Sequence, residues 1–212
     1  MKKAVIIILL VLLLDQAFKF FVKTTMCLGE SHSVFGNWFF IHFTENEGMA
    51  FGMKLGGNSG KLILSLFRIV AVIIIGWWLN KVVKQKGSPG LIFCISLIMA
   101  GAIGNIIDSM FYGMIFNDPA GMCVNQVATL FPKEGGYAGF LHGKVVDMLY
   151  FPIIETRFPQ WFPFWGGEEF VFFRPIFNIA DSSITIGVFI LIFFQRRFFK
   201  HNEEMNASGM EA

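Results

Sequence analysis

The sequence predicts a mostly α-helical membrane protein, with four transmembrane helices and a small β-rich sheet that faces outward on the membrane surface. Composition is the first observation behind this fold class. Of the 212 residues, 55% are hydrophobic and only 15% are charged, and the mean hydropathy is +0.61. Soluble proteins carry about 25% charged residues, so much of this surface is expected to face lipid. The second observation is the presence of four long apolar stretches.

Each apolar stretch comes close to the roughly 20 residues that a helix needs to cross a bilayer. The four stretches are residues 4–22, 62–80, 91–112 and 177–196. The first has two lysines before it, as a secretory signal peptide would. Asp15 and Lys19 inside it, and the lack of a small-residue cleavage site, favour a retained span instead. We therefore expect one membrane domain over residues 1–200 and a polar, disordered tail over residues 201–212.

Three groups of basic residues that flank the predicted spans fall on one side of the membrane. Such residues gather in cytoplasmic loops, so their positions indicate the orientation of the chain. They precede the first span, lie between the second and third, and follow the fourth: Lys2, Lys3, Lys81, Lys84, Lys86, Arg196, Arg197 and Lys200. Both termini are therefore predicted to be cytoplasmic, and residues 23–61 and 113–176 are predicted to face outward.

The outward segments are rich in aromatic residues. Residues 38–43 have the composition of a strand, with glycine and asparagine near the ends, which predicts a short sheet on the membrane surface. Aromatic residues also crowd residues 158–173, and such side chains settle at the level of the lipid headgroups. Simple anchoring is one interpretation of them, and a rim that receives an amphiphilic substrate is the other.

Polar side chains from all four predicted spans fall at one depth, in the outer half of the membrane. They are Asp15, Lys19, Arg68, Asn105, Asp108, Asn178 and Asp181. An unpaired polar group in hydrocarbon costs several kcal/mol, so the layer predicts a buried network or a site. Simpler interpretations stay open for two members: Asp15 and Lys19 have the spacing of a structural ion pair, and Arg68 is long enough to reach the outer surface. The small residues Ala100, Gly101, Ala102 and Gly104 predict close helix packing.

Several kinds of chemistry are disfavoured by the residues present. The four histidines lack the spacing of metal ligands, so we expect no metal and no cofactor. Ser182 and Ser183 have no neighbouring base and are expected to bond back to their own helix. Three cysteines are too few for a disulfide framework, although a Cys27–Cys123 bridge is conceivable. A net charge of +2 gives no sign of nucleic-acid binding.

Carboxylate chemistry remains, and two aspartates among apolar neighbours are its candidates. Asp147 lies in the run Gly143–Met148, and Asp181 lies at the start of the fourth span. Ionisable groups in such places are functional candidates by default. Two aspartates that approach each other closely share one proton, and such a pair can activate water to hydrolyse an amide.

Five motifs, in order along the chain, carry most of these polar residues. They are Asp15-Gln16 with Lys19, Asn46–Phe51, Gly101–Asp108, Val145–Asp147 and Phe177–Ser182. In this order they resemble the motifs of lipoprotein signal peptidase (signal peptidase II), a bacterial membrane aspartic endopeptidase, across nearly the whole chain. Each motif alone is weak, but five in order on a four-span protein are specific.

The resemblance implies that Asp147 and Asp181 are catalytic, and that the substrate is a prolipoprotein whose cysteine already carries diacylglyceryl. Cleavage then falls just before that cysteine. The resemblance also implies a bacterial cytoplasmic (inner) membrane location and contact with membrane lipid, and it agrees with the outward, periplasmic placement derived from the lysines. We expect a monomer. Substrate-binding or supporting roles fall on Asn46, Gly48, Asn105, Asp108, Asn178, Ala180, Asp15 and Lys19.

The chain departs from the family pattern in two places. Ser109 stands where the family commonly has an arginine, and Arg68, Arg157 or Arg174 are candidates to replace it. Residues 113–142 and 152–174 look longer than the usual connections, which predicts either an enlarged rim or lid, or plain lengthened loops.

A small proton- or ion-coupled transporter is the alternative from another functional class. It predicts polar residues through the full depth of the membrane and internal repeats of the spans. Neither is visible in the sequence. A membrane scaffold without chemistry leaves the positions of Asp147 and Asp181 unexplained.

Overall fold

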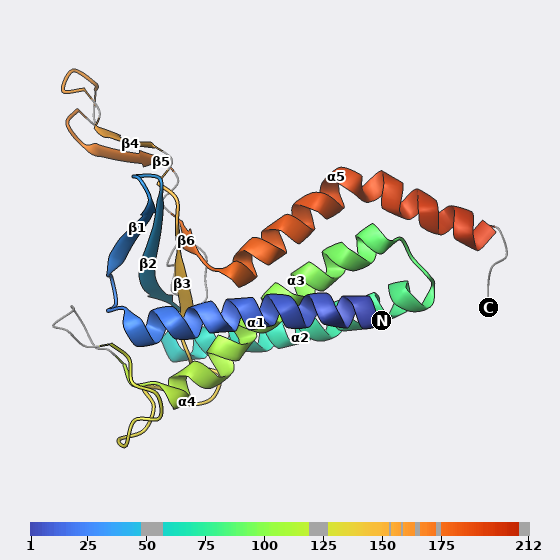
Figure 1. The fold of residues 1–212 in the computed structure, drawn as a ribbon, viewed down its shortest axis with the longest axis horizontal. Helices are drawn as coiled ribbons and strands as arrows, with labels where there is room; N and C mark the ends of the chain where they lie inside the picture. Colours follow the sequence, from blue (N-terminus) through green and yellow to red (C-terminus); the bar gives the residue numbers. More distant parts are fainter. Residues whose placement is uncertain are drawn as a thin grey trace.

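The computed structural model describes residues 1–47, 57–118, 127–152, 154–157, 159–163, 166–172 and 175–207. Long helices run side by side through most of the molecule, and strands lie across one end of them (Figure 1). The helices are α1 (Lys2–Thr25), α2 (Gly57–Lys84), α3 (Pro89–Ile107), α4 (Gly113–Ile115) and α5 (Ile179–Ala207), with a π-helix, η2 (Asp108–Tyr112), between α3 and α4. The strands are β1 (Ser31–Phe35), β2 (Phe39–Asn46), β3 (Val145–Tyr150), β4 (Ile154–Arg157), β5 (Glu169–Phe172) and β6 (Ile176–Phe177).

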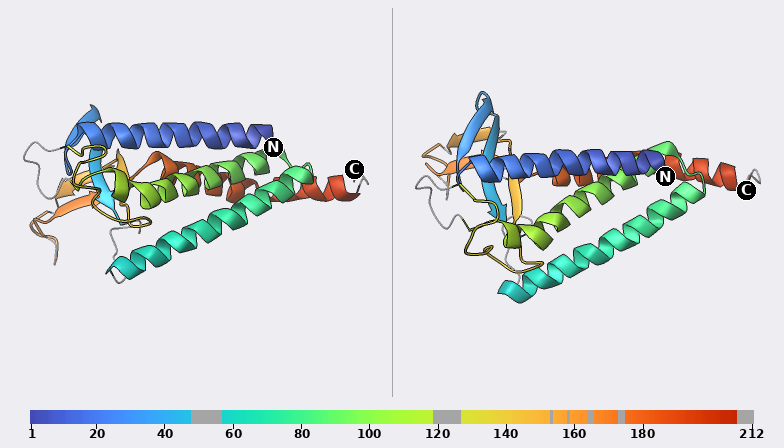
Figure 2. Two further views of the ribbon diagram at one scale, coloured as in Figure 1. Left: turned by 90° about the horizontal axis from the view of Figure 1, so that it is seen from below. Right: turned by 60° about the horizontal axis from the view of Figure 1, so that its bottom comes forward.

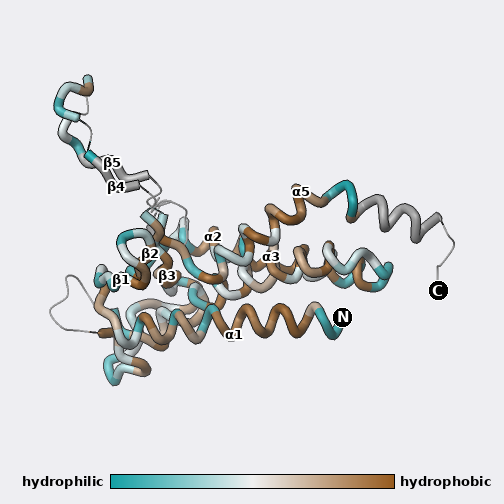
Figure 3. Tube along the Cα trace, turned by 45° about the horizontal axis from the view of Figure 1, so that its top comes forward, coloured by the Kyte–Doolittle hydropathy of each residue, from teal (hydrophilic) through white to brown (hydrophobic). Residues whose placement is uncertain are grey.

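Four helical segments are long and apolar enough to cross a membrane. They are Lys2–Thr25, Ser59–Lys84, Pro89–Ile115 and Ile179–Phe198, and they overlap the four predicted spans. Figure 3 shows the hydrophobic colour along these helices. Large apolar side chains on them point away from the protein, such as Leu13, Phe67 and Phe193, which are 67%, 68% and 77% exposed. Apolar surface of this kind belongs against lipid rather than water, so the predicted fold class is confirmed.

Helix α5 differs from the prediction at both ends. Phe177 belongs to strand β6, and the helix begins two residues later, at Ile179. At the other end the helix runs to Ala207. Residues 201–207, which were expected to be disordered, are therefore helical. No glycine or proline interrupts the sequence there before Gly209, so the chain contains nothing that ends the helix earlier.

The outward segments form the predicted surface sheet. Strands β1, β2, β3 and β6 pair in that order, and all the pairs are antiparallel. The strand expected at residues 38–43 is the first part of β2. Side chains alternate along a strand, so Val146 and Met148 enter the hydrophobic core while Asp147 points to the opposite face. Strands β4 and β5 form a separate two-stranded sheet, so the described part of residues 152–174 is more than a lengthened loop.

Small residues let α3 approach α1 and α5 closely, as predicted. A Cβ atom added to Gly101 would lie 2.2 Å from the Ala180 carbonyl oxygen of α5. At Gly104 an added Cβ atom would lie 2.7 Å from Asp15 Oδ2 of α1. Gly101 therefore admits no side chain without a shift of the α5 backbone, and a side chain at Gly104 would displace the buried Asp15 carboxylate. Helix α2 packs against α3 and diverges from the other helices toward the sheet (Figure 2).

Candidate active site

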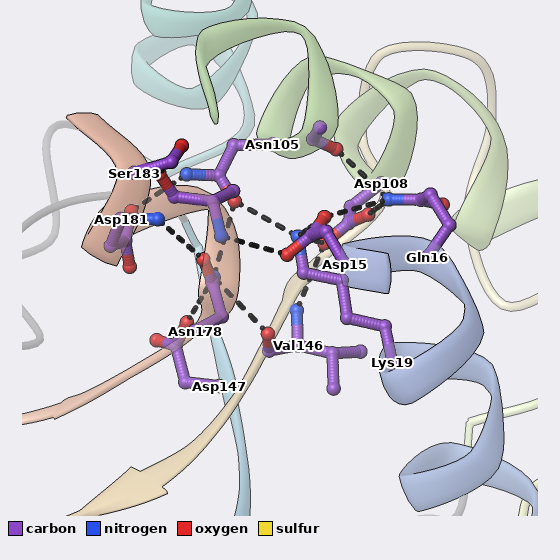
Figure 4. A network of polar contacts seen from close by, with 12 residues as sticks. Asp15, Gln16, Lys19, Asn105, Asp108, Val146, Asp147, Asn178, Asp181 and Ser183 are labelled. Atoms are coloured by element: carbon purple, nitrogen blue, oxygen red, sulfur yellow. Dashed lines mark hydrogen bonds and ion pairs between the residues drawn. The ribbon is translucent and has the colours of Figure 1, made fainter. Parts of the chain in front are cut away.

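Asp147 and Asp181 lie on two sides of one amide, the side chain of Asn178 (Figure 4). Asn178 Nδ2 donates a hydrogen bond of 2.7 Å to Asp147 Oδ1, and Asn178 Oδ1 accepts one of 2.8 Å from the Asp181 backbone N–H. The aspartates come from strand β3 and from the first turn of α5. Strand β6 pairs with β3 and leads directly into α5, which brings these distant parts of the chain together.

Asp147 is a buried carboxyl group with amide donors on both oxygens. Besides the bond from Asn178, its Oδ2 accepts a hydrogen bond of 3.1 Å from Asn46 Nδ2. Burial first, and then the nearby charge of Asp181, raise the pKa of Asp147 to about 7, against the lowering effect of the two amide donors. A carboxyl group with a pKa near neutrality can both give and take a proton under physiological conditions.

Asp181 is held by two asparagines. It is the third residue of α5, and Asn178 caps that helix by accepting its backbone N–H, as N-cap residues do. On the side chain, Asp181 Oδ1 accepts a hydrogen bond of 2.7 Å from Asn105 Nδ2 of α3. Asn105 Oδ1 in turn accepts a hydrogen bond of 3.1 Å from Asn178 Nδ2. The asparagines therefore connect both aspartates to α3.

A buried charged network supports this arrangement from behind. Lys19 Nζ lies 2.9 Å from Asp15 Oδ2, 2.8 Å from Asp108 Oδ2 and 3.0 Å from Asn105 Oδ1. Asp15 also accepts a hydrogen bond of 2.9 Å at Oδ1 from the backbone N–H of Ala180. The expected ion pair between Asp15 and Lys19 is present, and it belongs to a network that joins α1, α3 and α5. Residues that the sequence places at one depth are thus in direct contact.

Gln16 and Tyr112 complete the network, although the sequence analysis did not select them. Gln16 Nε2 donates hydrogen bonds of 2.9 Å to Asp108 Oδ1 and 3.2 Å to the Gly104 carbonyl oxygen. Tyr112 donates its hydroxyl hydrogen to Gln16 Oε1 over 3.1 Å. Asp108 Oδ2 also accepts the backbone N–H of Val146 over 3.2 Å, which connects α3 to the strand of the candidate pair. Gln16 stands inside the first motif, and that position is the signal that could have found it.

Ser182 and Ser183 behave as expected. Ser182 Oγ donates a hydrogen bond of 2.8 Å to the Asn178 carbonyl oxygen, and Ser183 Oγ donates one of 2.8 Å to the Ala180 carbonyl oxygen. Ser183 Oγ also lies 3.1 Å from the Leu97 carbonyl oxygen of α3, so that hydroxyl contacts a second helix besides its own. Within the described ranges, no three His, Cys, Asp or Glu side chains gather as metal ligands would.

Three positions singled out in the sequence lie outside the described residues: Gly48, Arg174 and Cys123. Cys27, the partner considered for Cys123, forms no disulfide with another described cysteine. Arg157, by contrast, is described, and it is an exposed residue at the end of β4, opposite Glu169 in the two-stranded sheet.

The sequence of the chain matches a known protein family. A sequence model of signal peptidase (SPase) II matches residues 7–197. The chain belongs to the signal peptidase II family. A lipoprotein signal peptidase of Porphyromonas gingivalis is 57% identical over 187 residues, which cover 88% of this chain and 79% of that protein. One from Amoebophilus asiaticus is 36% identical over 193 residues, which cover 90% and 76%.

Solved structures agree with this assignment. Two bacterial membrane enzymes match the fold with a TM-score of 0.57 each, at 26% and 27% sequence identity. The matches cover 93% and 91% of this chain, and 89% and 92% of the two enzymes. The resemblance to signal peptidase II is therefore confirmed. Membership in this aspartic peptidase family favours a peptidase over a transporter.

The third membrane span contains a π-helical turn, which the sequence motifs do not predict. It begins at Asp108, and the carbonyl oxygen of Ser109 accepts a hydrogen bond of 2.9 Å from the backbone N–H of Gly143. A Cβ atom at Gly143 would lie 2.2 Å from the Asp108 carbonyl oxygen, so only glycine fits. Turns of this type often occur at functional sites. Here the turn receives the segment that leads into β3, and no sequence signal predicted it.

A second buried ion pair, Lys23 with Glu45, lies outside the signal peptidase II motifs. Lys23 Nζ is also 5.4 Å from the ring centroid of Tyr137, and Lys144 Nζ lies 3.5 Å from Glu45 Oε2. This cluster joins α1 to β2 on the face of the sheet opposite Asp147. Lys23 follows the lysine of the first motif by one helical turn, and that spacing was the available signal.

Proposed function

We propose that Asp147 and Asp181 are the catalytic pair of an endopeptidase that removes the signal peptide from prolipoproteins. The substrate carries diacylglyceryl on its cysteine, and the bond just before that cysteine is cut. One observation carries the assignment of the pair: two asparagine side chains in contact with each other link the two carboxyl groups. Asn178 Nδ2 donates to Asp147 Oδ1 over 2.7 Å, and Asn105 Nδ2 donates to Asp181 Oδ1 over 2.7 Å. The lipoprotein signal peptidases among the relatives support the choice of substrate.

The pair works by sharing one proton. Burial and the charge of Asp181 raise the pKa of Asp147 to about 7, and two neighbouring carboxyl groups do not both ionise readily. The ionised member takes a proton from water, whose oxygen attacks the scissile carbonyl carbon. The protonated member gives its hydrogen to the carbonyl oxygen, which forms a tetrahedral diol. The roles belong to the pair, because the titrations of such groups are coupled.

The second half of the reaction restores the pair. The proton taken from water passes to the leaving nitrogen as the carbon–nitrogen bond breaks. One hydroxyl of the diol returns its hydrogen to the other aspartate as the carboxyl product forms. Water is consumed, one amide is cut, and the pair again holds one proton. Neither a metal nor a cofactor takes part in this scheme.

Other residues of the network position the pair and the substrate. The asparagine amides fix the orientation of the carboxyl groups, and the buried charges hold the helices and β3 in register. Gly48 receives its role from the family resemblance alone. We assign supporting or substrate-binding roles to Asn46, Gly48, Asn105, Asp108, Asn178, Ala180, Asp15 and Lys19.

Cleavage of a synthetic prolipoprotein peptide tests the function. We expect the wild-type protein in detergent to cut the diacylglyceryl form just before its cysteine and to leave the unlipidated form intact. Asp147→Asn and Asp181→Asn should each reduce cutting to background without loss of fold, as judged by Tm. The matched control is Asp118→Asn, because Asp118 is an exposed residue in a surface ion pair with Lys144. Full activity of either catalytic variant overturns the pair, and equal cutting of both peptides overturns the lipidated substrate.

We also infer a multi-pass location in the bacterial cytoplasmic membrane, with both termini in the cytoplasm and the pair near the outer face. The basic residues that flank the helices support this orientation. The test is labelling of single cysteines in a chain whose three native cysteines are replaced by serine. A membrane-impermeant maleimide should label Ser33→Cys in intact cells and Gln85→Cys only in broken cells. The reverse pattern would overturn the orientation.

A monomer is the form we propose to be active. One chain by itself supplies the asparagines and the buried charges that hold the candidate pair, which supports this proposal. The mass of the active fraction in detergent tests this, because activity confined to a dimer fraction would contradict it.

A further inference from the structure

The ion pair between Lys23 and Glu45 joins helix α1 to strand β2 inside the hydrophobic core. Both side chains are buried, with 0% and 2% of their surfaces exposed. The ring centroids of Phe43, Phe116 and Tyr137 lie 5.9, 5.1 and 5.4 Å from Lys23 Nζ. Aromatic rings at this distance attract a cation, so they help to hold the ammonium group in place. Glu45 is therefore fixed by a partner that has little freedom to move.

Glu45 also contacts the beginning of strand β3. Glu45 Oε2 lies 3.5 Å from Lys144 Nζ, which is an ion-pair distance rather than that of a good hydrogen bond. Lys144 directly precedes β3, and its backbone N–H donates a hydrogen bond of 2.6 Å to the Tyr137 hydroxyl. The carboxylate of Glu45 thus links α1, β2 and β3 at the place where β2 ends and β3 begins.

The end of β2 depends on a short stretch of strand pairing. Toward β1, the backbone hydrogen bonds of β2 end at Phe43. Toward β3, the register is irregular between Ile41 and Thr44. Three register pairs follow that irregularity: Thr44 with Asp147, Glu45 with Val146, and Asn46 with Val145. Strand ends open more readily than strands paired on both sides, so a side-chain anchor at Glu45 strongly influences where this segment lies.

Glu45 and Asn46 are neighbours whose side chains point to opposite faces of the sheet. Side chains alternate along a strand, so Glu45 lies on the core face with Lys23, and Asn46 lies on the face of Asp147. There Asn46 Nδ2 donates its hydrogen bond of 3.1 Å to Asp147 Oδ2. Successive Cα atoms are about 3.8 Å apart, so a shift of Glu45 carries Asn46 with it. The bond is near the upper end of the normal range, so a small outward shift would break it.

Lys19, one helical turn before Lys23, has a different set of partners. Its ammonium group contacts Asp15 of its own helix, and Asp108 and Asn105 of the third membrane span. The two buried lysines of α1 therefore fix different elements, because Lys19 binds the third span and Lys23 binds β2. Helix α1 thus sets the sheet and the third span relative to each other.

We propose that Lys23 and Glu45 are positioning residues of the peptidase, whose ion pair fixes the end of β2 so that Asn46 can hold Asp147 in its reactive orientation. The proposal rests on the peptidase function proposed above. It also gives a reason for a charged pair in this core. Replacing a buried ion pair with apolar residues of similar volume is often neutral or stabilising, so stability alone does not account for the pair.

A mutant cycle with Asn46 tests this role. Lys23→Met/Glu45→Met replaces both charges with apolar side chains of similar length, and the aromatic core should accept them with little change in Tm. We expect kcat on the diacylglyceryl peptide to fall about 10-fold with KM nearly unchanged, as expected when one hydrogen bond to the catalytic pair is lost. In an Asn46→Ala background the same double change should lower kcat by less than about 2-fold, because the bond that it disturbs is already absent.

His32→Gln is the matched control on the same sheet. His32 contacts Glu30 over 2.7 Å at the surface, so loss of this pair should leave kcat unchanged in both backgrounds. Glu45→Gln, which keeps the shape of the side chain, repeats the cycle should the double variant lower the Tm.

Two results overturn the positioning role. A purely structural pair would lower kcat by the same factor with and without Asn46, and wild-type kcat in Asn46→Ala would show that the Asn46 bond does not matter. In both cases the wild-type protein still cuts the peptide, so the peptidase function stands. A wild-type protein that cuts nothing would instead overturn the function and this role together.

Discussion

Asn178 and Asp147 are joined by a hydrogen bond of 2.7 Å, in which the side-chain amide donates to Asp147 Oδ1. The same nitrogen also approaches the Asn105 side-chain oxygen at 3.1 Å and the Val146 carbonyl oxygen at 3.2 Å. An amide nitrogen has only two hydrogens for these three acceptors, so the shortest contact takes the largest share. The position of Asp147 and its readiness to hold a proton therefore both depend on Asn178.

Replacing Asn178 tests this dependence. Burial and the charge of Asp181 raise the pKa of Asp147 to about 7 even though the Asn178 amide donor lowers it, so Asn178→Ala should raise that pKa further. The alkaline limb of the kcat profile should then move to higher pH, and kcat should fall by about 10- to 100-fold with loss of a hydrogen bond to a charged group. The measurement is kcat from pH 5 to 9, with Asn80→Ala in α2 as the control. An unmoved alkaline limb in an active Asn178→Ala variant would contradict the argument.

Asp147 also makes stability depend on pH. Its pKa is 3.8 in an ordinary environment and about 7 in the folded protein, so between these values the folded state binds more protons than the unfolded state. Stability therefore falls as pH rises through this window, and the full cost of the buried charge is present above pH 7. That cost is on the order of 4 kcal/mol, from about three pKa units.

Asp147→Asn removes the buried charge and should therefore stabilise the protein at pH 8. The gain should shrink as pH falls and vanish near pH 4, where both states of the wild-type protein are protonated. Thermal unfolding in detergent at pH 4, 6 and 8 measures it. Asp118→Asn, at an exposed carboxylate, should show no such trend. A gain that stays constant across the pH range would disprove the linkage.

Much of the site follows from the sequence because bilayer depth orders residues along a helix. Asp15, Lys19, Asn105, Asp108 and Asp181 lie on spans whose ends could be read from composition, and charged groups in hydrocarbon must find partners. Their shared depth therefore predicted contact, and the ion pairs and hydrogen bonds of the network bear this out.

The positions of residues outside the regular membrane helices cannot be predicted from the sequence in the same way. Nothing in the local sequence fixed Asp147 on a strand that pairs with β6, because strand pairing depends on contacts far apart in the chain. The π-helical turn at Asp108 and the Lys23–Glu45 pair likewise arise from tertiary contacts, and their residues alone match ordinary helix and strand composition. Gly143 became interpretable only once the Asp108 carbonyl oxygen was found beside it.

Glycine at position 101 should be indispensable for helix packing. A Cβ atom there would meet the Ala180 carbonyl oxygen at 2.2 Å and Ser183 Oγ at 2.5 Å, and backbone atoms cannot turn aside as a flexible side chain can. Gly101→Ala should therefore destabilise the protein by about 3 kcal/mol or more, at the upper end of overpacking effects. Gly139→Ala is the matched control, because an added Cβ atom there has nothing within 4 Å. Equal Tm values for the two variants would refute the close packing of α3 against α5.

Lys19 should matter more for stability than any lysine at the membrane surface. Its ammonium group contacts Asp15 over 2.9 Å and Asp108 over 2.8 Å, and all three side chains are buried. Lys19→Met leaves two carboxyl groups without their cation, and breaking a buried ion pair on one side costs about 3–5 kcal/mol. The drop in Tm measures this cost, with Lys84→Met as the exposed control. Because the penalty comes from the unpaired carboxylates rather than from lost packing, adding Asp108→Asn to Lys19→Met should restore part of the Tm. A double variant less stable than Lys19→Met alone would show that the ion pair is not the source of the effect.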